Sequence, residues 1–239
     1  MKRIVNLSRF TKTVASIVII AILFSACKKS TLDIPATPAA GVMAFNLIPD
    51  KTIGFTVSGD NLTRNALPFT SYTGAYLPVY PGAREVKSYN IANGIQLAST
   101  SGTFADSLYY SVFAVGLNGS YRNIITQDHL NELTKQAGKA YVRYINAITD
   151  STATPTVTIT SGGSAVVNSG AAYASVSGFT AVPAGIISIA VAGGTEFNSA
   201  RTITAEENKV YTVLLLGTPG SSDSSSVVQI KYINNGIVN

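Results

Sequence analysis

The chain has 239 residues, enough for one large domain or for two domains of ordinary size. Its formal charge of +5 suggests a basic protein, but four of its 17 Lys and Arg residues precede Cys27, and none of its 12 Asp and Glu residues does. The 13 basic and 12 acidic residues that remain nearly cancel and are scattered along the chain. This balance argues against nucleic acid as a partner.

The first residues have the three parts of a secretion signal. A basic stretch, Met1–Lys12, precedes an apolar run, Thr13–Phe24, and small residues follow at Ser25 and Ala26. The apolar run has 12 residues, whereas crossing a bilayer takes about 20. We therefore expect a cleaved signal rather than a transmembrane anchor.

The five residues at the end of this signal resemble the lipobox of bacterial lipoproteins. The resemblance implies that a signal peptidase recognises Leu23, Phe24, Ser25 and Ala26 and cuts before Cys27, whose thiol carries a diacylglycerol. Phe24 departs from the leucine that is commoner there. Cys27 is the only cysteine of the chain, so no intramolecular disulfide is expected. We expect residues 1–26 to be the signal peptide and the N-terminal lipid to bind the protein to a membrane.

Residues 27–39 read as a lipidated cysteine followed by a tether. Pro35 and Pro38 stand among small residues, which favours an extended chain over a helix. No Asp follows Cys27, so the lipoprotein resemblance implies outer-membrane sorting, and the absence of an acidic cluster there favours the periplasmic face over the cell surface. A short tether of this kind would hold a first domain near the bilayer and a second domain farther away.

The rest of the chain contains two copies of one pattern. VMAFNLIPD, starting at Val42, recurs as VRYINAITD, starting at Val142, and further matches follow at offsets of 101 to 103. A period near 100 residues is far longer than a solenoid repeat, so it indicates tandem domains. The expected organisation is a first domain at residues 40–130, a linker at 131–138, a second domain at 139–233 and a tail at 234–239.

Both copies show alternation and β-branched runs broken by Gly, Pro, Asn and Ser, which predicts short strands. In the first copy we expect strands at Val42–Asn46, Ile53–Ser58, Ser71–Val79, Arg84–Tyr89, Gln96–Phe104, Tyr109–Val115 and Asn123–Thr126. In the second copy we expect them at Tyr141–Asn146, Thr156–Thr160, Ala172–Phe179, Ile186–Ala192, Arg201–Thr204, Val210–Leu216 and Val227–Ile233. Seven strands per 100 residues predict an all-β protein of two tandem immunoglobulin-like β-sandwich domains. One or two helical turns are expected at Asp128–Gln136.

Three repeated motifs resemble the bacterial family called domain of unknown function 4397. They are an opening strand that ends in Asn before a loop with Asp, an aromatic–x–x–Val strand that runs into Gly, and a Tyr-x-Val strand that ends in Gly. Their positions are Asn46 to Asp50 and Asn146 to Asp150, Tyr76 to Gly82 and Phe179 to Gly185, and Tyr110 to Gly116 and Tyr211 to Gly217. The resemblance implies tandem domains of a secreted or envelope protein, and it brings no activity that could be assigned to a residue.

The residues that carry chemistry are few, and each has a structural explanation. His129 is the only histidine and lies in the polar connector without a nucleophile nearby. Asp50, Asp150 and Glu206-Glu207 lack the spacing of a calcium loop. The pairs Gly162-Gly163 and Gly193-Gly194 lack the Lys of a phosphate-binding loop and predict hairpin turns. We therefore expect no catalytic residue, no metal site and no cofactor.

One aromatic pattern is a candidate binding surface. If Tyr72–Tyr80 is a strand, Tyr72, Tyr76 and Tyr80 share one face, and the second copy keeps an aromatic residue only opposite Tyr76. Exposed tyrosines serve as stacking or docking surfaces. The alternative, which we favour, is that they pack between the two domains or under a loop.

Together these patterns predict a non-catalytic lipoprotein of the cell envelope that acts as a binding or structural module for another envelope protein or a glycan. A hydrolase of an envelope polymer, with a site between the domains, is one alternative. A passive adhesin-type stalk is another.

Overall fold

The computed structural model describes residues 37–149, 154–223 and 226–238. Strands make up its regular structure, with one 3-10 turn, η1 (Leu130–Glu132), where a helical turn was expected. No helix in this described part is long and apolar enough to span a membrane. The predicted signal peptide and Cys27 lie outside the described residues.

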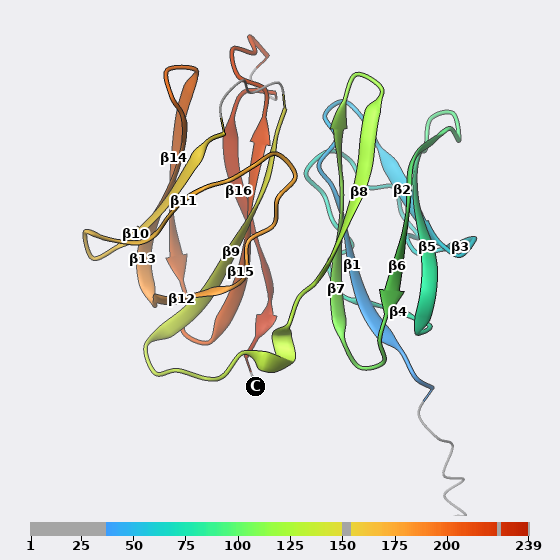
Figure 1. Ribbon diagram of the computed structural model, residues 1–239, viewed down its shortest axis with the longest axis horizontal. Coiled ribbons are helices and arrows are strands. Elements are labelled where there is room, and N and C mark those ends of the chain that lie inside the picture. Colours follow the sequence, from blue (N-terminus) through green and yellow to red (C-terminus); the bar gives the residue numbers. More distant parts are fainter. Residues whose placement is uncertain (1–36, 150–153, 224–225, 239) are drawn as a thin grey trace, which may run out of the picture. The chain divides into compact units, whose positions relative to one another are not determined.

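All the strands belong to one compact unit, Pro38–Asn239. Its first eight strands form a β-sandwich (Figure 1) whose two sheets have the orders β4-β1-β7-β8 and β3-β2-β5-β6. They are β1 (Ala40–Asn46), β2 (Ile53–Val57), β3 (Asp60–Asn61), β4 (Leu77–Val79), β5 (Gly82–Asn90), β6 (Gln96–Phe104), β7 (Tyr109–Leu117) and β8 (Ser120–Gln127).

The next eight strands form a second β-sandwich with the same strand orders, β12-β9-β15-β16 and β11-β10-β13-β14. They are β9 (Lys139–Ile148), β10 (Thr156–Ser161), β11 (Ser164–Gly170), β12 (Thr180–Pro183), β13 (Gly185–Gly193), β14 (Phe197–Ala205), β15 (Lys209–Gly217) and β16 (Gln229–Ile237). The duplication and the two all-β sandwiches expected from the sequence are confirmed. Each sandwich has eight strands rather than seven. The predicted domain boundaries remain a prediction about independent folding.

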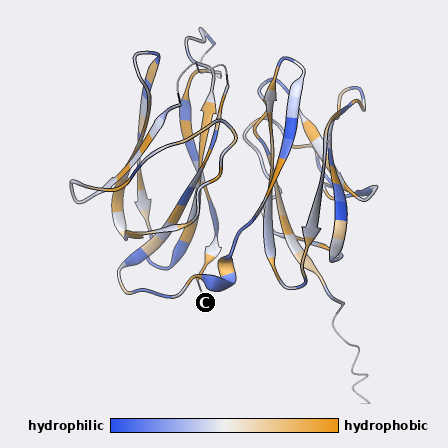
Figure 2. Cartoon of the chain, in the orientation of Figure 1, coloured by the Kyte–Doolittle hydropathy of each residue, from blue (hydrophilic) through white to orange (hydrophobic). Residues whose placement is uncertain are grey.

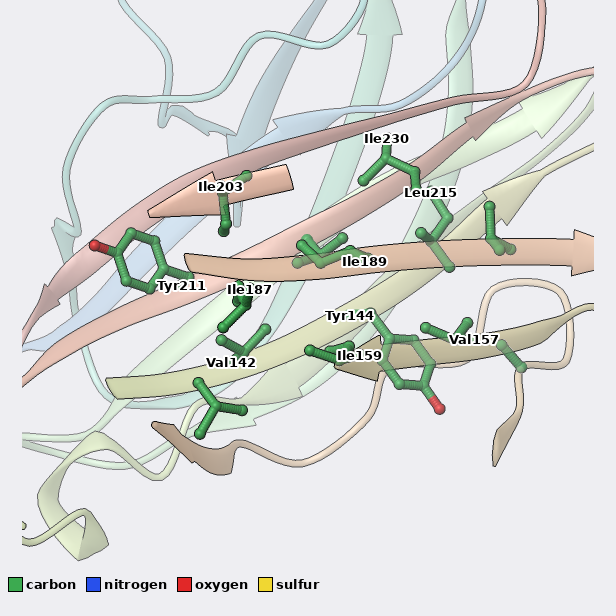
Figure 3. Close-up of a cluster of buried hydrophobic side chains, with 14 of the residues drawn as sticks. Val142, Tyr144, Val157, Ile159, Ile187, Ile189, Ile203, Tyr211, Leu215 and Ile230 are labelled. Carbon is green, nitrogen blue, oxygen red and sulfur yellow. The ribbon is translucent and has the colours of Figure 1, made fainter. Parts of the chain in front are cut away.

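Alternating side chains fill the core of each sandwich. In β13, Ile187, Ile189 and Val191 are buried, whereas Ser188 and Ala190 between them are partly exposed. Figure 3 shows the isoleucines of this strand among the other core side chains of the second sandwich. Each such side chain contributes roughly 1.5–3 kcal/mol by leaving water. Hydrophobic positions lie along the strands of both sandwiches, and hydrophilic ones gather in the connector after β8 (Figure 2).

Strands β1, β7, β9 and β15 are buried on both faces. In β1, Val42 and Ala44 belong to the first core, whereas Met43 and Phe45 join a cluster that includes Ile145 and other residues of the second sandwich. The sheets that contain these strands therefore pack face to face. The two sandwiches therefore share one buried joint. Burial on both faces explains why these strands have continuous apolar sequences.

Parallel pairing brings two of the repeated motifs together. Strand β1 runs parallel to β7, with Val42 opposite Tyr110, and β9 runs parallel to β15, with Val142 opposite Tyr211. The opening strand and the Tyr-x-Val strand of each copy are therefore neighbours at the centre of one sheet.

The main errors of the sequence prediction concern edge strands. The expected strands Ser71–Val79 and Ala172–Phe179 are mostly irregular, and the observed edge strands β4 and β12 are short. Thr70, Gly74 and Ala174 have positive φ, so strand pairing in these two segments is limited to single bridges. The bridges join Tyr72 to Phe45 and Val176 to Ile145. Strands β3 and β11 were not predicted. The turns at Gly162-Gly163 and Gly193-Gly194 are hairpin turns, as predicted.

Gly116, in the β7–β8 hairpin, supplies a test of the fold. It has φ 141°, and a Cβ there would lie 2.2 Å from the Ser120 carbonyl oxygen. We expect Gly116→Ala to lower the free energy of unfolding by about 3 kcal/mol or more, because backbone overlap adds to the cost of positive φ. Urea unfolding measures the loss.

Gly119→Ala is the matched control, since Gly119 has φ 89° in the same hairpin and nothing within 4 Å of its Cβ position. Its expected loss is only about 1–2 kcal/mol. Equal losses in both variants would contradict the close approach described for Gly116.

Candidate functional site

The described chain buries one ion pair completely, and it lies at the joint. Arg143 in β9 places its Nη1 2.6 Å from Oδ1 of Asp128, the residue that follows β8. The side chains are 2% and 0% exposed. One partner therefore comes from the end of the first sandwich and the other from the second.

The other two nitrogens of Arg143 also donate hydrogen bonds. Its Nε donates to Thr212 Oγ1 at 2.9 Å, and its Nη2 donates to Ser111 Oγ at 2.8 Å. The guanidinium carbon lies 4.5 Å from the ring centre of Phe179 and 5.8 Å from that of Phe113. Aromatic faces thus supply the cation with further stabilisation where water is excluded.

The second carboxylate oxygen of Asp128 accepts two more hydrogen bonds, from the hydroxyls of Ser111 and Tyr76. Tyr76 also accepts from Asn235 Nδ2 at 3.3 Å, and Asn235 Oδ1 accepts from Thr212 at 2.6 Å. Burial, and then the negative charge of Asp128, raise the pKa of Tyr76 far above its ordinary value. Tyr76 therefore remains a hydrogen-bond donor at every physiological pH.

This network is an assembly element, because its charged groups are closed to solvent and cannot touch a substrate. Sequence reasoning did not find it. A signal was present, since Arg143 interrupts an apolar strand at the position where the first copy has Met43. A charge in a strand that is buried on both faces requires a buried partner.

The polar residues of the repeated motifs hold backbone. Asn46 Oδ1 accepts from the N–H of Ile48 at 3.0 Å, and Asn146 does the same for Ile148 at 2.9 Å. The hydroxyl of Tyr110 accepts the N–H of Ala105, and in the second copy the hydroxyl of Tyr211 accepts the N–H of Glu206. These motifs therefore stabilise the scaffold and do not form a site.

The structure separates the three tyrosines of the candidate aromatic surface. Tyr72 stacks on Phe45 at the joint, with ring centres 5.5 Å apart. Tyr76 lies in the buried network, and Tyr80 is 67% exposed. The irregular backbone between them prevents one shared face. Tyr72 and Tyr76 thus occupy the packed position that was the favoured alternative, and a binding role for Tyr80 stays a prediction.

The other candidate residues do not come together. His129 Nδ1 lies 2.6 Å from Glu132 Oε1, and both side chains are more than half exposed. Glu206 pairs with Lys209, and Glu207 accepts the N–H of Gly138. Asp50 is exposed in a turn, and Asp150 lies outside the described residues. Within the described ranges, no three His, Cys, Asp or Glu side chains gather as metal ligands.

The sheet of the second sandwich that faces away from the joint has an uncharged outer face. Its strands β10, β13 and β14 alternate between core residues and outward residues that pair across the strands. The outward residues, which we call the uncharged outer face, are Thr156, Thr158, Thr160, Ile186, Ser188, Ala190, Ala192, Asn198, Ala200, Thr202 and Thr204.

The equivalent face of the first sandwich differs. It carries an ion pair in which Lys87 Nζ lies 2.9 Å from Glu85 Oε2. A hydrogen bond from Ser99, and then the neighbouring Lys87, lower the pKa of Glu85, so the carboxylate stays charged. The two copies therefore keep one scaffold and present different surfaces.

A double-mutant cycle tests the buried pair. Arg143→Met, which reproduces the residue of the first copy, leaves Asp128 charged and unpaired, and Asp128→Asn leaves Arg143 in the same state. Each single change should lower the free energy of unfolding by about 3–5 kcal/mol. The double variant should regain much of that loss, because no buried charge remains. Additive losses in urea unfolding would contradict a direct interaction between the two side chains.

Comparisons with known proteins agree with the internal repeat. The model of the family described as Domain of unknown function (DUF4397) matches residues 40–153 and again residues 140–231. No protein of curated function matches the chain significantly.

Solved structures give distant likenesses. One, on α-glucan recognition by family 41 carbohydrate-binding modules from streptococcal virulence factors, is 11% identical, with coverage of 82% of this chain and 97% of the other and a TM-score of 0.25. A putative cell adhesion protein from Bacteroides ovatus is 13% identical, with coverage of 83% and 98% and a TM-score of 0.24. The two family matches span most of the chain, which therefore belongs to the DUF4397 family and carries two tandem copies of its domain.

Proposed function

We propose that this protein is a non-catalytic lipoprotein of the bacterial cell envelope. Its N-terminal lipid would hold it to the outer membrane on the periplasmic face, and its two sandwiches would bind or support another envelope protein or a glycan. The absence of catalysis in this proposal is supported by the contacts that the polar residues make. The buried pair Asp128–Arg143 and the motif residues Asn46 and Tyr110 all bind groups of the scaffold itself.

The anchor is supported by the sequence before the strands. A basic stretch, an apolar run too short to span a bilayer and small residues before Cys27 have the order of a lipoprotein signal. Two or three acyl chains make a stable membrane anchor, since each buried CH₂ contributes roughly 0.8 kcal/mol.

The binding surface is best sought on the faces that the joint leaves free. One is the uncharged outer face of the second sandwich, where hydroxyl groups of Thr158 and Thr202 can donate and accept hydrogen bonds without a charge to desolvate. Such a face suits neutral polar partners, which include glycans and uncharged protein surfaces.

Replacement of Cys27 tests the anchor. In Cys27→Ala the acceptor thiol is absent, so radiolabelled fatty acid should no longer be incorporated and a longer precursor should accumulate. Lys28→Ala is the control and should be labelled and processed normally. Labelling that persists in Cys27→Ala would show that this cysteine is not the lipid acceptor.

Placing charge on the uncharged outer face tests binding. Thr202→Lys and Thr204→Lys should weaken recovery of cross-linked partners, or signal on a glycan array, by about tenfold or more, because the new charges must be desolvated. Ser101→Lys and Thr103→Lys occupy the equivalent strand of the first sandwich and should leave recovery unchanged. If the two pairs act equally, or the native protein recovers neither protein nor glycan, the proposed surface is wrong.

A further inference from the structure

Four large apolar side chains of the described residues are 60% exposed or more, and one of them, Ile95, lies apart from the other three in the β5–β6 turn. Ile186 is 71% exposed, Tyr80 67% and Ile237 62%, which makes them the most exposed of their kind in the described chain. Single exposed apolar residues need no explanation. Each of the three, however, lies near the start of the opening strand of its sandwich, which is β1 for Tyr80 and β9 for Ile186 and Ile237.

In the first sandwich, Tyr80 lies where the chain enters β1. Ala40, the first residue of β1, pairs with Val79, so Tyr80 follows directly beside Ala39. Ala39 is held there by its N–H, which donates to Asp106 Oδ1 at 2.8 Å, and by its carbonyl, which accepts from Ser107 at 2.9 Å. The tether from Cys27 therefore meets the fold beside Tyr80.

In the second sandwich, the other two residues lie where β9 begins. Lys139 at the start of β9 pairs with Pro183, three residues before Ile186. Ile237 pairs with Lys209 at the start of β15, the parallel neighbour of β9.

The buried network brings these two ends together. Asp128 follows the end of β8 and binds Arg143, the fifth of the ten residues of β9, and Tyr76, just before β4, binds Asn235 near the end of β16. The starts of β1 and β9 thus share one end of the Pro38–Asn239 unit. Tyr80, Ile186 and Ile237 belong to that end.

We infer that this end rests on the lipid bilayer, with Tyr80, Ile186 and Ile237 entering the headgroup region. The inference rests on the proposed lipid anchor. Only twelve residues separate Cys27 from Ala40, so at about 3.1 Å per residue the tether reaches at most roughly 37 Å. A tether of this length holds the end at millimolar effective concentration near the bilayer, so weak contacts suffice. Tyrosine suits the interface because its ring is apolar and its hydroxyl remains in water.

Charge contributes little to this contact. Glu206 pairs with Lys209 at 2.7 Å, and Glu207 and Asp106 accept backbone N–H groups. Glu206 and Glu207 lie at the end that holds Lys139 and Lys209, and in the first sandwich Asp106 binds Ala39 while Arg84 Nε donates to the Tyr80 carbonyl at 3.0 Å, so these groups form no cluster of one sign. The contact should therefore form on neutral lipid and should not weaken as salt is added.

Tryptophan fluorescence tests the inference, because the chain contains no Trp. Tyr80→Trp places the only indole at the proposed contact. Ile95→Trp is the matched control, since Ile95 is 60% exposed in the β5–β6 turn, at the opposite end of β5 from Gly82. Each variant of residues 27–239 is coupled through Cys27 to a maleimide lipid in phosphatidylcholine vesicles that contain brominated lipid.

We expect the indole of Tyr80→Trp to be quenched at least threefold more than that of Ile95→Trp, at low and at high salt. Ile186→Trp should behave like Tyr80→Trp and provides a second probe if the first variant does not fold. Equal quenching of all the variants would overturn the contact. Chemical coupling replaces acylation here, so that result would leave the lipid anchor to be judged by fatty-acid labelling of Cys27→Ala in cells.

Discussion

Arg143 carries a full charge where water does not reach, and the joint between the sandwiches is built around that constraint. Burying an unpaired ion costs several kcal/mol, so each nitrogen of the guanidinium needs a partner. Asp128 and Ser111 from the first sandwich and Thr212 from the second meet this need. Because the partners come from both copies, neither sandwich alone can satisfy the charge, and the relative position of the sheets follows from it.

The duplication gives the joint two similar halves that are not identical. Arg122 in β8 lies over the ring of Tyr173 in the second copy, and Lys231 in β16 donates to Thr70 in the first copy. The buried charges break this reciprocity, since the second copy has Arg143 where the first has Met43. The two sheets that meet at the joint are therefore similar in fold but carry different polar contacts. The outer sheets carry no such constraint, which is where the copies have acquired different surfaces.

Much of the architecture could be predicted from the sequence because it depends on local periodicity and on self-comparison. The repeat at Val42 and Val142, the hairpin glycines and most strands were of this kind. The edge strands could not be predicted, because the positive φ of residues such as Ala174 leaves no clear trace in sequence. The joint was missed for another reason: burial of β1 on both faces depends on contacts between residues about 100 positions apart. For the same reason Tyr76 was considered for a surface, whereas its hydroxyl binds Asp128 in the interior.

Native-state hydrogen exchange at increasing urea concentration tests most directly whether the two sandwiches form one unit around the buried network. If they do, the slowest amides of β1 and β7 and those of β9 and β15 should exchange through one common opening with the free energy of global unfolding. The contrary result is a separate, lower-energy opening that exposes the amides of one sandwich while the other stays protected. That result would mean that the Asp128–Arg143 pair does not unite the two copies.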